Sequence, residues 1–513
     1  MSEAAVAEPT QPPEPPQVIT VTNPATLEKV AEVPVTDEAG VQAAVERARA
    51  AQAVWREMDF ARRAAALRRY RDAIIDNKDR IAEVVVSETG KPIAEVYGGE
   101  LMYVCDAIGY WAKNAERFLA DQYVRPHLLR NKAAYSTYRP LGVVGIIGPW
   151  NFPFTLTIGE GLPALMAGNA VIIKPSEVTP RSTVIGCEIA DEAGLPRGLL
   201  QAIPGFGATG GWLVDRADMI CFTGSVATGK KVAQRAAARL IPVTLELGGK
   251  DPMIVLKDAD LERAVNGCVW GGLFNAGQVC MSVERVYVEE PVYDAFVQKV
   301  SERVRQLRQG HSKEEIDVGS MTFPPQLAKV EQHVQEALAA GATLLAGGRR
   351  NPALPGLFYE PTVLTNVNHQ MEVMREETFG PVIPIMKVHD VDEAIRLAND
   401  SPYGLTASIW TRDLEKGRVL ARRIEAGAVC VNDALINFMV TDVPMGGVKD
   451  SGLGRRHGPD GIRKFCAQQT VVVDRWGARR EINWYPARRG AARLYRRLLN
   501  LLFRSGWRKK LSA

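Results

Sequence analysis

The sequence predicts an α/β fold built on a doubly wound parallel sheet. Short, continuously apolar runs, each ending in Gly, Pro or polar residues, occupy 141–150, 170–177, 219–225 and 252–256. Helical stretches at 181–193 and 226–239 alternate with them. Strands that are apolar throughout and alternate with helices are typical of parallel sheets buried on both faces. Ligands of such sheets bind beyond the carboxyl ends of the strands, where Asn151, Lys174 and Ser225 fall.

The remaining elements follow in order. Residues 1–17 are acidic and rich in proline, and they lack the basic and apolar parts of a signal peptide, so we expect a disordered leader. Residues 37–88 have helical periodicity, with Asp37 and Asp59 as candidate N-caps. A second α/β unit is predicted to start near Gly248, with helices at 260–274, 291–309 and 325–340 and strands at 382–388 and 427–432. The stretch 470–475 predicts an edge strand that pairs with 132–140 or with another subunit.

Length and composition limit the classes of protein. A chain of 513 residues with 46% hydrophobic and 24% charged residues is typical of a globular protein with two or three domains. The net charge of +4 gives no case for nucleic-acid binding, and nine basic residues with no acid fall in 484–513, which leaves −5 for the rest. Seven scattered cysteines without a CxxC pair predict no metal site and a reducing compartment, the cytoplasm.

Two glycine-rich motifs have competing interpretations. GFGATG at 205–210, centred on Gly207, fits a dinucleotide fingerprint, but no acidic residue follows about 20 positions later, so an ordinary glycine turn is the alternative. GSVATGKK at 224–231 resembles a P-loop, but Lys231 replaces the hydroxyl residue that would ligate Mg²⁺. The same segment can bind a pyrophosphate at a helix N-terminus, or it can be a plain helix capped by Ser225.

Four residues gain meaning as a set. Singly, Cys280 could be a small core residue, Glu246 a capping acid, Asn151 a turn residue and Lys174 a solvated charge. Together they provide a nucleophile, a base that activates water, an amide that stabilises an oxyanion and a cation that holds a dinucleotide. These groups are the ones that oxidation through a thioester requires.

Over residues 20–475 the chain resembles the aldehyde dehydrogenase superfamily, through PWNFP, KPSE, FTGS, ELGGK, GQVC, EETFGPV and PMGGVKDSGLGR in family order. The resemblance implies that Cys280 is the nucleophile, Glu246 the general base and Asn151 the side-chain half of the oxyanion hole. Cofactor binding is expected at Trp150, Lys174, Glu177, Ser225, Glu377 and Phe379, together with Gly207 from the glycine motif. Glu177 favours NAD, with NADP as the other option.

The resemblance also implies a division into domains and an oligomer. We expect an NAD(P)-binding domain (18–121 and 141–247), a catalytic domain (248–446) and an oligomerisation flap (122–140 and 466–475). Family members form homodimers or homotetramers. The extension 476–513 lies beyond the usual family end.

Two positions depart from the family pattern, and one loop indicates the substrate. Arg456 stands where many members have a glutamate, and Glu160 stands where many have a lysine. The segment 432–447 resembles the branch that acts on fatty, aromatic or carotenoid aldehydes, so we expect an apolar aliphatic or aromatic aldehyde, bound by Phe152, Phe438 and Met439. A semialdehyde dehydrogenase and a catalytically silent scaffold of the same fold are the alternatives.

The tail 484–513 predicts a basic amphipathic helix. Leu494, Leu498, Leu501 and Leu502 fall on one helical face, and arginines occupy much of the remainder. Such a helix can lie in the headgroup region of an anionic membrane, which would make the protein membrane-peripheral. The alternative is a helix docked on its own domain or across a subunit interface.

Overall fold

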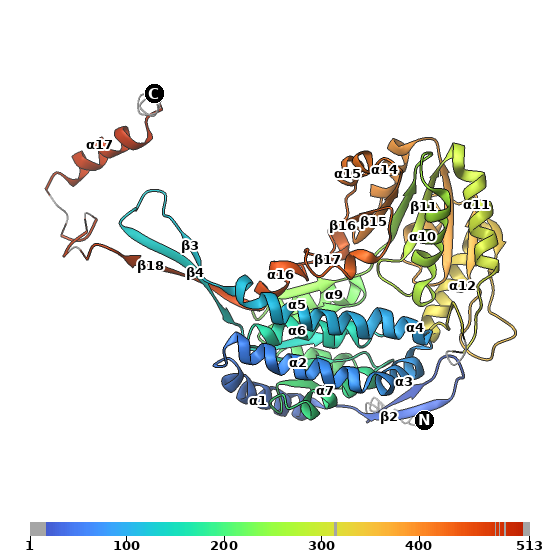
Figure 1. The fold of residues 1–513 in the computed structure, drawn as a ribbon, viewed down its shortest axis with the longest axis horizontal. Coiled ribbons are helices and arrows are strands. Elements are labelled where there is room, and N and C mark those ends of the chain that lie inside the picture. Colours follow the sequence, from blue (N-terminus) through green and yellow to red (C-terminus); the bar gives the residue numbers. More distant parts are fainter. Residues whose placement is uncertain (1–16, 312–314, 478, 482, 487–488, 506–513) are drawn as a thin grey trace, which may run out of the picture. The chain divides into compact units, whose positions relative to one another are not determined.

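The computed structural model describes residues 17–311, 315–477, 479–481, 483–486 and 489–505. The predicted leader, apart from Gln17, therefore lies outside the described residues. The chain divides into two compact units, of which the larger comprises Met1–Ala120 with Tyr138–Ala467 and the smaller Asp121–Thr137 with Gln468–Ala513. Figure 1 shows the ribbon of each.

A six-stranded sheet forms the first half of the larger unit. Its strands are β5 (Val143–Ile147), β6 (Ala170–Lys174), β7 (Leu200–Ala202), β8 (Met219–Thr223), β9 (Val243–Glu246) and β17 (Gly452–Leu453). The order is β17-β9-β8-β5-β6-β7, and every pair is parallel except β17 with β9. From β5 the chain adds β6 and β7 on one side, then returns to add β8 and β9 on the other side of β5. The strand order therefore reverses between β5 and β8, and ligands of doubly wound sheets bind at such a switch point.

Helices cover both faces of this sheet, as the predicted fold class requires (Figure 1). One layer contains α1 (Glu38–Trp55), α8 (Gly207–Val214) and α9 (Val226–Ala237). The other contains α6 (Glu160–Met166) and α7 (Arg181–Glu192), backed by α2 (Phe60–Asp76), α3 (Lys78–Thr89) and α5 (Met102–Leu119). The predicted caps are confirmed, because Asp37 accepts from Gly40 N and Asp59 from Arg62 N. The short α4 (Ile93–Val96) and the hairpin of β1 (Val18–Thr22) and β2 (Lys29–Pro34) complete this half.

A seven-stranded sheet forms the second half. Its strands are β10 (Asp251–Val255), β11 (Val283–Glu289), β12 (Thr343–Ala346), β13 (Thr362–Thr365), β14 (Val382–Val388), β15 (Thr406–Trp410) and β16 (Ala428–Val431). The order is β12-β13-β14-β11-β10-β15-β16, with only β12 and β13 antiparallel to each other. Its helices are α10 (Leu261–Leu273), α11 (Glu290–Arg305), α12 (Pro324–Ala339), α13 (Glu372–Arg375), α14 (Val391–Asn399) and α15 (Leu414–Ala421). The short α16 (Gly458–Arg463) follows β17.

The smaller unit holds most of a three-stranded sheet of order β18-β4-β3. The strands are β3 (Gln122–Val124), β4 (Lys132–Pro140) and β18 (Cys466–Asp474), so the expected pairing of 470–475 with 132–140 occurs within the chain. Lys132 Nζ lies 2.8 Å from Asp474 Oδ1. The tail forms α17 (Ala491–Phe503), and none of the described helices is long and apolar enough to cross a membrane.

Candidate active site

The residues predicted to carry the chemistry lie together in the larger unit. Glu246 is the last residue of β9, Asn151 follows β5, and Cys280 lies in the loop between α10 and β11. All three line a small crevice of about 140 Å³. Trp150, Ser225, Glu377 and Phe379 line the same crevice. The six-stranded sheet thus delivers Asn151 and Glu246, and the seven-stranded half delivers Cys280.

The Cys280 loop has an unusual backbone that ties it to Asn151. Asn275 and Ala276 adopt positive φ angles of 52° and 53°, and a Cβ at Gly277 (φ 70°) would collide with the Gly380 carbonyl oxygen. The Asn275 side-chain amide donates to Asn151 O at 3.1 Å and to Gln278 O at 3.2 Å. Backbone strain of this kind persists only when surrounding contacts fix it. The loop is therefore held rigidly beside Asn151.

A buried ion pair holds the backbone of Asn151 from the other side. Lys91 Nζ lies 2.7 Å from Glu100 Oε1 and donates to Asn151 O at 2.7 Å. The second Glu100 oxygen accepts from Phe154 N and Thr155 N, two residues of the same loop. The Asn151 amide itself donates to Gln278 O at 2.9 Å, so its position relative to the Cys280 loop is fixed. Sequence reasoning missed Lys91, which lies in the short connection between α3 and α4 and has no local signal.

Glu246 is a buried carboxyl group whose pKa lies near neutral pH. Burial raises its pKa to about 7, while Arg456, Lys464 and Arg455 act in the lowering direction and Glu160 in the raising direction. Burial and the nearby carboxylates, Glu377 foremost, raise the pKa of the Cys280 thiol well above its ordinary value. The resting thiol is therefore neutral, and a carboxylate with a pKa near 7 can accept a proton at neutral pH.

The crevice has an aromatic corner and a second buried carboxylate. The Trp150 and Phe379 rings meet edge to face, with centroids 5.4 Å apart. Glu377 Oε1 accepts from Gly249 N at 2.9 Å, and burial raises the pKa of Glu377 to about 7. Ser225 caps α9 by accepting from Thr228 N, which is compatible both with a plain capped helix and with a pyrophosphate site at the start of α9.

Three of the predicted cofactor residues lie apart from the crevice lining. Lys174 ends β6, and its Nζ lies 2.9 Å from Glu177 Oε2. The Glu177 side chain is 44% exposed, whereas Lys174 is buried. Because β6 pairs in parallel with β5, this ion pair lies at the same sheet edge as Asn151. Gly207 begins α8 after β7, and it does not line the crevice.

A second, larger cavity of about 520 Å³ adjoins the crevice, and Cys280 and Leu156 line both. Its apolar wall comes from the segments around Cys280, Pro92 and Ile316, from the 432–447 loop and from the loop after Asn151. The apolar side chains are Pro92, Ala94, Phe152, Leu156, Trp270, Phe274, Val279, Met281, Ile316, Leu435, Ile436, Phe438 and Met439. All three predicted pocket residues are thus in the wall, whereas Val440 and Val443 of the same loop are exposed and do not line it.

The charge of this cavity is distinctive. Glu95 and Asp317 contribute to the wall, and none of the described lining residues is a lysine, arginine or histidine. Burial raises the pKa of Glu95 to about 8, and its carboxylate accepts from Asn275 N. Sequence reasoning missed Trp270, Phe274 and Met281, although the last two flank Cys280 closely enough for proximity in sequence to have indicated them.

Comparison with known proteins agrees with this geometry. The chain belongs to the aldehyde dehydrogenase family, whose sequence model matches residues 11–471. It is an NAD(P)-dependent oxidoreductase that oxidises an aldehyde. The predicted superfamily, fold class and enzyme class are confirmed.

Relatives carry different substrate names. The chain is 43% identical over 446 residues, 86% of each chain, to a Mycolicibacterium smegmatis protein named provisionally as a succinate-semialdehyde dehydrogenase that uses NADP(+). It is 41% identical over 456 residues, 88% of this chain and 85% of the other, to the 4,4'-diapolycopene aldehyde oxidase of Methylomonas sp. Among solved structures, Mycobacterium tuberculosis aldehyde dehydrogenase complexed with NAD+ is 35% identical with a TM-score of 0.86, covering 91% of this chain and 97% of that one.

Proposed function

We propose that the enzyme oxidises apolar aliphatic or aromatic aldehydes through a thioester on Cys280. The observation that carries this proposal is that Cys280 lies in the wall between an apolar cavity and a polar crevice. An aldehyde whose tail fills the apolar cavity presents its carbonyl at the Cys280 sulfur. The polar crevice supplies the base and the oxyanion donor on the opposite side.

The first chemical step is attack by the sulfur. The Cys280 thiol loses its proton to Glu246, which is one of two carboxylates in the crevice with a pKa of about 7, the other being Glu377. The thiolate adds to the carbonyl carbon and forms a thiohemiacetal whose oxyanion is stabilised by the Asn151 amide and by the backbone N–H of Cys280. One such donor contributes about 3–4 kcal/mol to the stability of the transition state. Oxidation then leaves an acyl thioester on Cys280.

The second step is hydrolysis. Glu246 removes a proton from a water molecule, the resulting hydroxide attacks the thioester carbonyl, and the carboxylate leaves as the Cys280 sulfur is released. Glu246 is suited to this role because it lines the same crevice as Cys280 and its Oε1 has no hydrogen-bond partner among the described residues.

The residues of the polar crevice fit a nicotinamide dinucleotide. A Cβ at Gly248 would lie 2.8 Å from Glu377 Oε2, so only glycine leaves this part of the cradle open. We assign Trp150, Glu377 and Phe379 to the nicotinamide end and Ser225 at the start of α9 to the pyrophosphate. Lys174 and Glu177 would hold the adenosine ribose, and Gly207 would lie nearest that end. When bound, NAD(P) supplies the hydride acceptor.

We propose that NAD is preferred over NADP. The Glu177 carboxylate can accept a hydrogen bond from a ribose 2′-hydroxyl and repels a 2′-phosphate. Its exposure of 44% leaves the carboxylate accessible to a ligand. A steady-state comparison of kcat/KM for NAD and NADP tests this preference, and a strong native preference for NADP would show that the role of Glu177 is wrong.

A semialdehyde with a free carboxylate is the alternative substrate, because relatives are named for succinate semialdehyde. The described cavity wall argues against it, since none of the described lining residues is a cation that would pair with the free carboxylate. A panel of C2 to C10 aldehydes together with succinate semialdehyde separates the two. Each buried methylene should raise kcat/KM about fourfold, from about 0.8 kcal/mol per methylene. Equal efficiency on C2 and C8, or a best rate on succinate semialdehyde, would refute the apolar assignment.

We also propose that different regions of the chain have separate functions and that the protein forms an oligomer. Residues 18–121 and 141–247 would bind the cofactor, 248–446 would supply Cys280 and the substrate cavity, and 122–140 with 466–475 would join subunits of a homodimer or homotetramer. Exposed apolar side chains on the three-stranded sheet support the last assignment: Tyr123, Val124, Val472 and Val473. Light scattering after size-exclusion chromatography, on the parent chain and on a variant with Tyr123 and Val472 changed to Asp, should show a lower mass for the variant.

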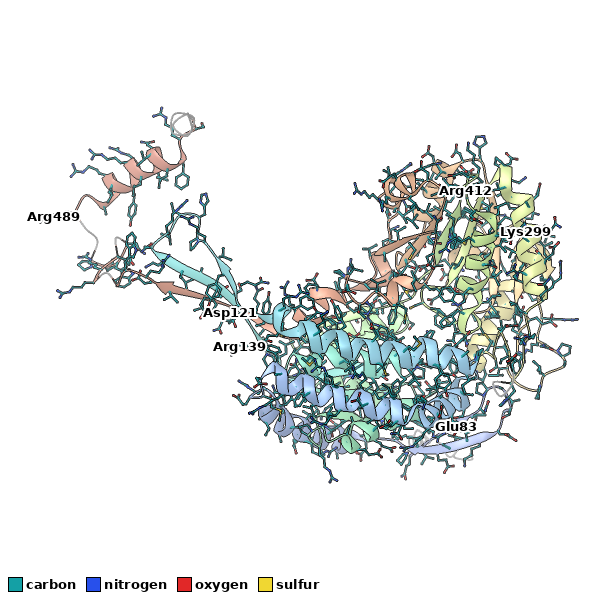
Figure 2. All side chains as sticks on the ribbon, in the orientation of Figure 1. Glu83, Asp121, Arg139, Lys299, Arg412 and Arg489 are labelled. Carbon is teal, nitrogen blue, oxygen red and sulfur yellow. The ribbon has the colours of Figure 1, made fainter. Side chains whose placement is uncertain are left out.

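A peripheral membrane site is the second part of the proposal, and it rests on α17. No residue of this helix is buried, and its apolar side chains include Leu499 and Phe503, which are 60% and 58% exposed. Leu494, Tyr495, Leu498, Leu499, Leu501, Leu502 and Phe503 cover one arc of the helix, opposite Arg493, Arg496 and Arg497. Figure 2 shows side chains projecting from the helix that follows Arg489. Leucines buried among acyl chains with arginines at anionic headgroups fit this pattern.

We accordingly place the enzyme in the cytoplasm, at a membrane surface. All seven cysteines are free, as expected in a reducing compartment. Sedimentation with anionic vesicles at low and high salt tests the site, comparing the full chain, a chain ending at Arg480 and a full-length variant with Leu498 and Leu502 changed to Asp. The full chain should pellet at low salt and the other two should not. A full chain that remains in the supernatant at low salt excludes the membrane site, and a mass change without pelleting would assign α17 to subunit contact.

A further inference from the structure

Three charged side chains, those of Arg456, Glu160 and Lys464, form a cluster next to Glu246. Arg456 Nη2 lies 2.9 Å from Glu160 Oε2, and Lys464 Nζ lies 2.6 Å from Glu160 Oε1. All three side chains are largely buried, with exposed fractions of 6%, 5% and 11% for Arg456, Glu160 and Lys464. Both oxygens of Glu160 are thus paired with cations. The two positions that depart from the family pattern contact each other directly. Where many members have a lysine this chain has Glu160, and where many have a glutamate it has Arg456, so the two charges are exchanged.

Arg456 also faces the base. Its Nε lies 3.9 Å from Glu246 Oε1. Among the buried side chains that the structure describes, both of these atoms lack a hydrogen-bond partner. Leaving a buried donor and a buried acceptor unpaired is costly, so a small movement of the Glu246 side chain that joins them is favoured. Glu246 is the member of this pair that can move, because Glu160 already holds the Arg456 guanidinium.

Other contacts keep Arg456 in place. Its backbone N–H donates to Met445 O and its carbonyl accepts from Met445 N, both at 2.8 Å. Its guanidinium carbon lies 5.5 Å from the centroid of the Phe438 ring, which lines the apolar cavity, and Nη2 donates to Thr223 Oγ1 at 3.4 Å. An arginine fixed at this many points presents a stationary positive charge beside Glu246.

We propose that Arg456, anchored by Glu160, is a positioning residue that holds the Glu246 carboxylate by its charge and so prepares it for thioester hydrolysis. The inference rests on the proposed role of Glu246 as the base. Arg456 is the foremost group that opposes the burial-driven rise of the Glu246 pKa, followed by Lys464, with Arg455 acting in the same direction and Glu160 in the opposite one. Glu377 and the Cys280 thiol are the other titratable groups that line the crevice with Glu246.

The test measures the decay of the Cys280 acyl adduct by mass spectrometry after a single turnover, between pH 5.5 and 9.5. Arg456→Gln should move the ascending limb of hydrolysis to higher pH by about one unit, which makes hydrolysis about tenfold slower below the limb and leaves it near the parent rate at high pH. Arg456→Lys retains a cation and should stay within about half a unit of the parent. Arg463→Gln is the matched control: that half-buried arginine donates to Phe118 O and does not face Glu246.

Each outcome decides the matter. If the pH–rate profile of hydrolysis in Arg456→Gln rises at the same pH as that of the parent, the inference is overturned. It is also overturned if the profile of Arg463→Gln shifts by the same amount. If Arg456→Gln fails to fold, the double variant Glu160→Arg with Arg456→Glu keeps an ion pair but places an anion beside Glu246, and it should shift the limb upward. No shift in that variant also overturns the inference. Normal hydrolysis in Glu246→Gln would instead refute the proposed base, so the two failures are distinguishable.

Discussion

The pH dependence of thioester hydrolysis gives the sharpest check on the proposed chemistry. Burial of Glu246 raises its pKa to about 7. The ionised fraction of such a group rises from about 9% at pH 6 to about 91% at pH 8, so hydrolysis should accelerate about tenfold between these values. A carboxyl group at its ordinary pKa would be almost fully ionised throughout, and the rate would barely change. The magnitude therefore depends on the buried environment of Glu246.

Replacing Glu246 by Gln keeps the size of the side chain and removes the base. The variant should still reach a burst of NADH with an amplitude of about one per active site, but more slowly, because Glu246 also accepts the proton of the Cys280 thiol. Its steady-state rate should fall by about 10²–10⁴-fold and lose the dependence on a group of pKa near 7. Stopped-flow absorbance measures the burst, and mass spectrometry should find the acyl adduct on Cys280. A normal steady-state rate in the variant, or a parent rate that is flat from pH 6 to pH 8, would refute the reasoning.

The same burial predicts an effect on stability. A carboxyl group whose pKa is raised by folding binds its proton more tightly in the folded state, so its contribution to the free energy of unfolding is largest below the unfolded pKa and falls as pH rises to about 7. Glu246→Gln should therefore unfold at a higher temperature relative to the parent at pH 8 than at pH 5. Differential scanning calorimetry at both pH values measures this, and a difference in Tm that does not change with pH would contradict it.

Further predictions concern the other groups. Cys280→Ala should abolish oxidation while retaining NAD binding, as measured by calorimetric titration; residual turnover would exclude Cys280 as the nucleophile. Glu177→Gln should raise kcat/KM for NADP relative to NAD, and an unchanged ratio would show that Glu177 does not contact the ribose. Trp270→Ala should lower kcat/KM for a C8 aldehyde about tenfold or more while leaving acetaldehyde nearly unaffected, because Trp270 lines the apolar cavity and not the crevice that holds Glu246 and Asn151; equal losses on both substrates would point to a structural role.

Much of the fold followed from local chemistry that the sequence displays directly. Asp37 and Asp59 cap helices because a short acceptor side chain satisfies backbone N–H groups wherever a helix begins. The strands that end near Asn151 and Lys174 could be predicted from the sequence, because a strand buried on both faces must be apolar throughout. Motif order then predicted the family, which the comparisons confirm.

What the sequence by itself determined was therefore the set of elements, the family and the candidate residues. The tertiary structure decided which of those residues share a wall: Cys280 lies between two cavities whose linings come from widely separated segments. It also decided that the two departures from the family pattern, Glu160 and Arg456, form an ion pair beside Glu246. Capping and periodicity act over a few residues and leave a trace in the local sequence. Contacts between distant segments depend on how whole layers of helices and strands pack, so no local sequence pattern predicts them.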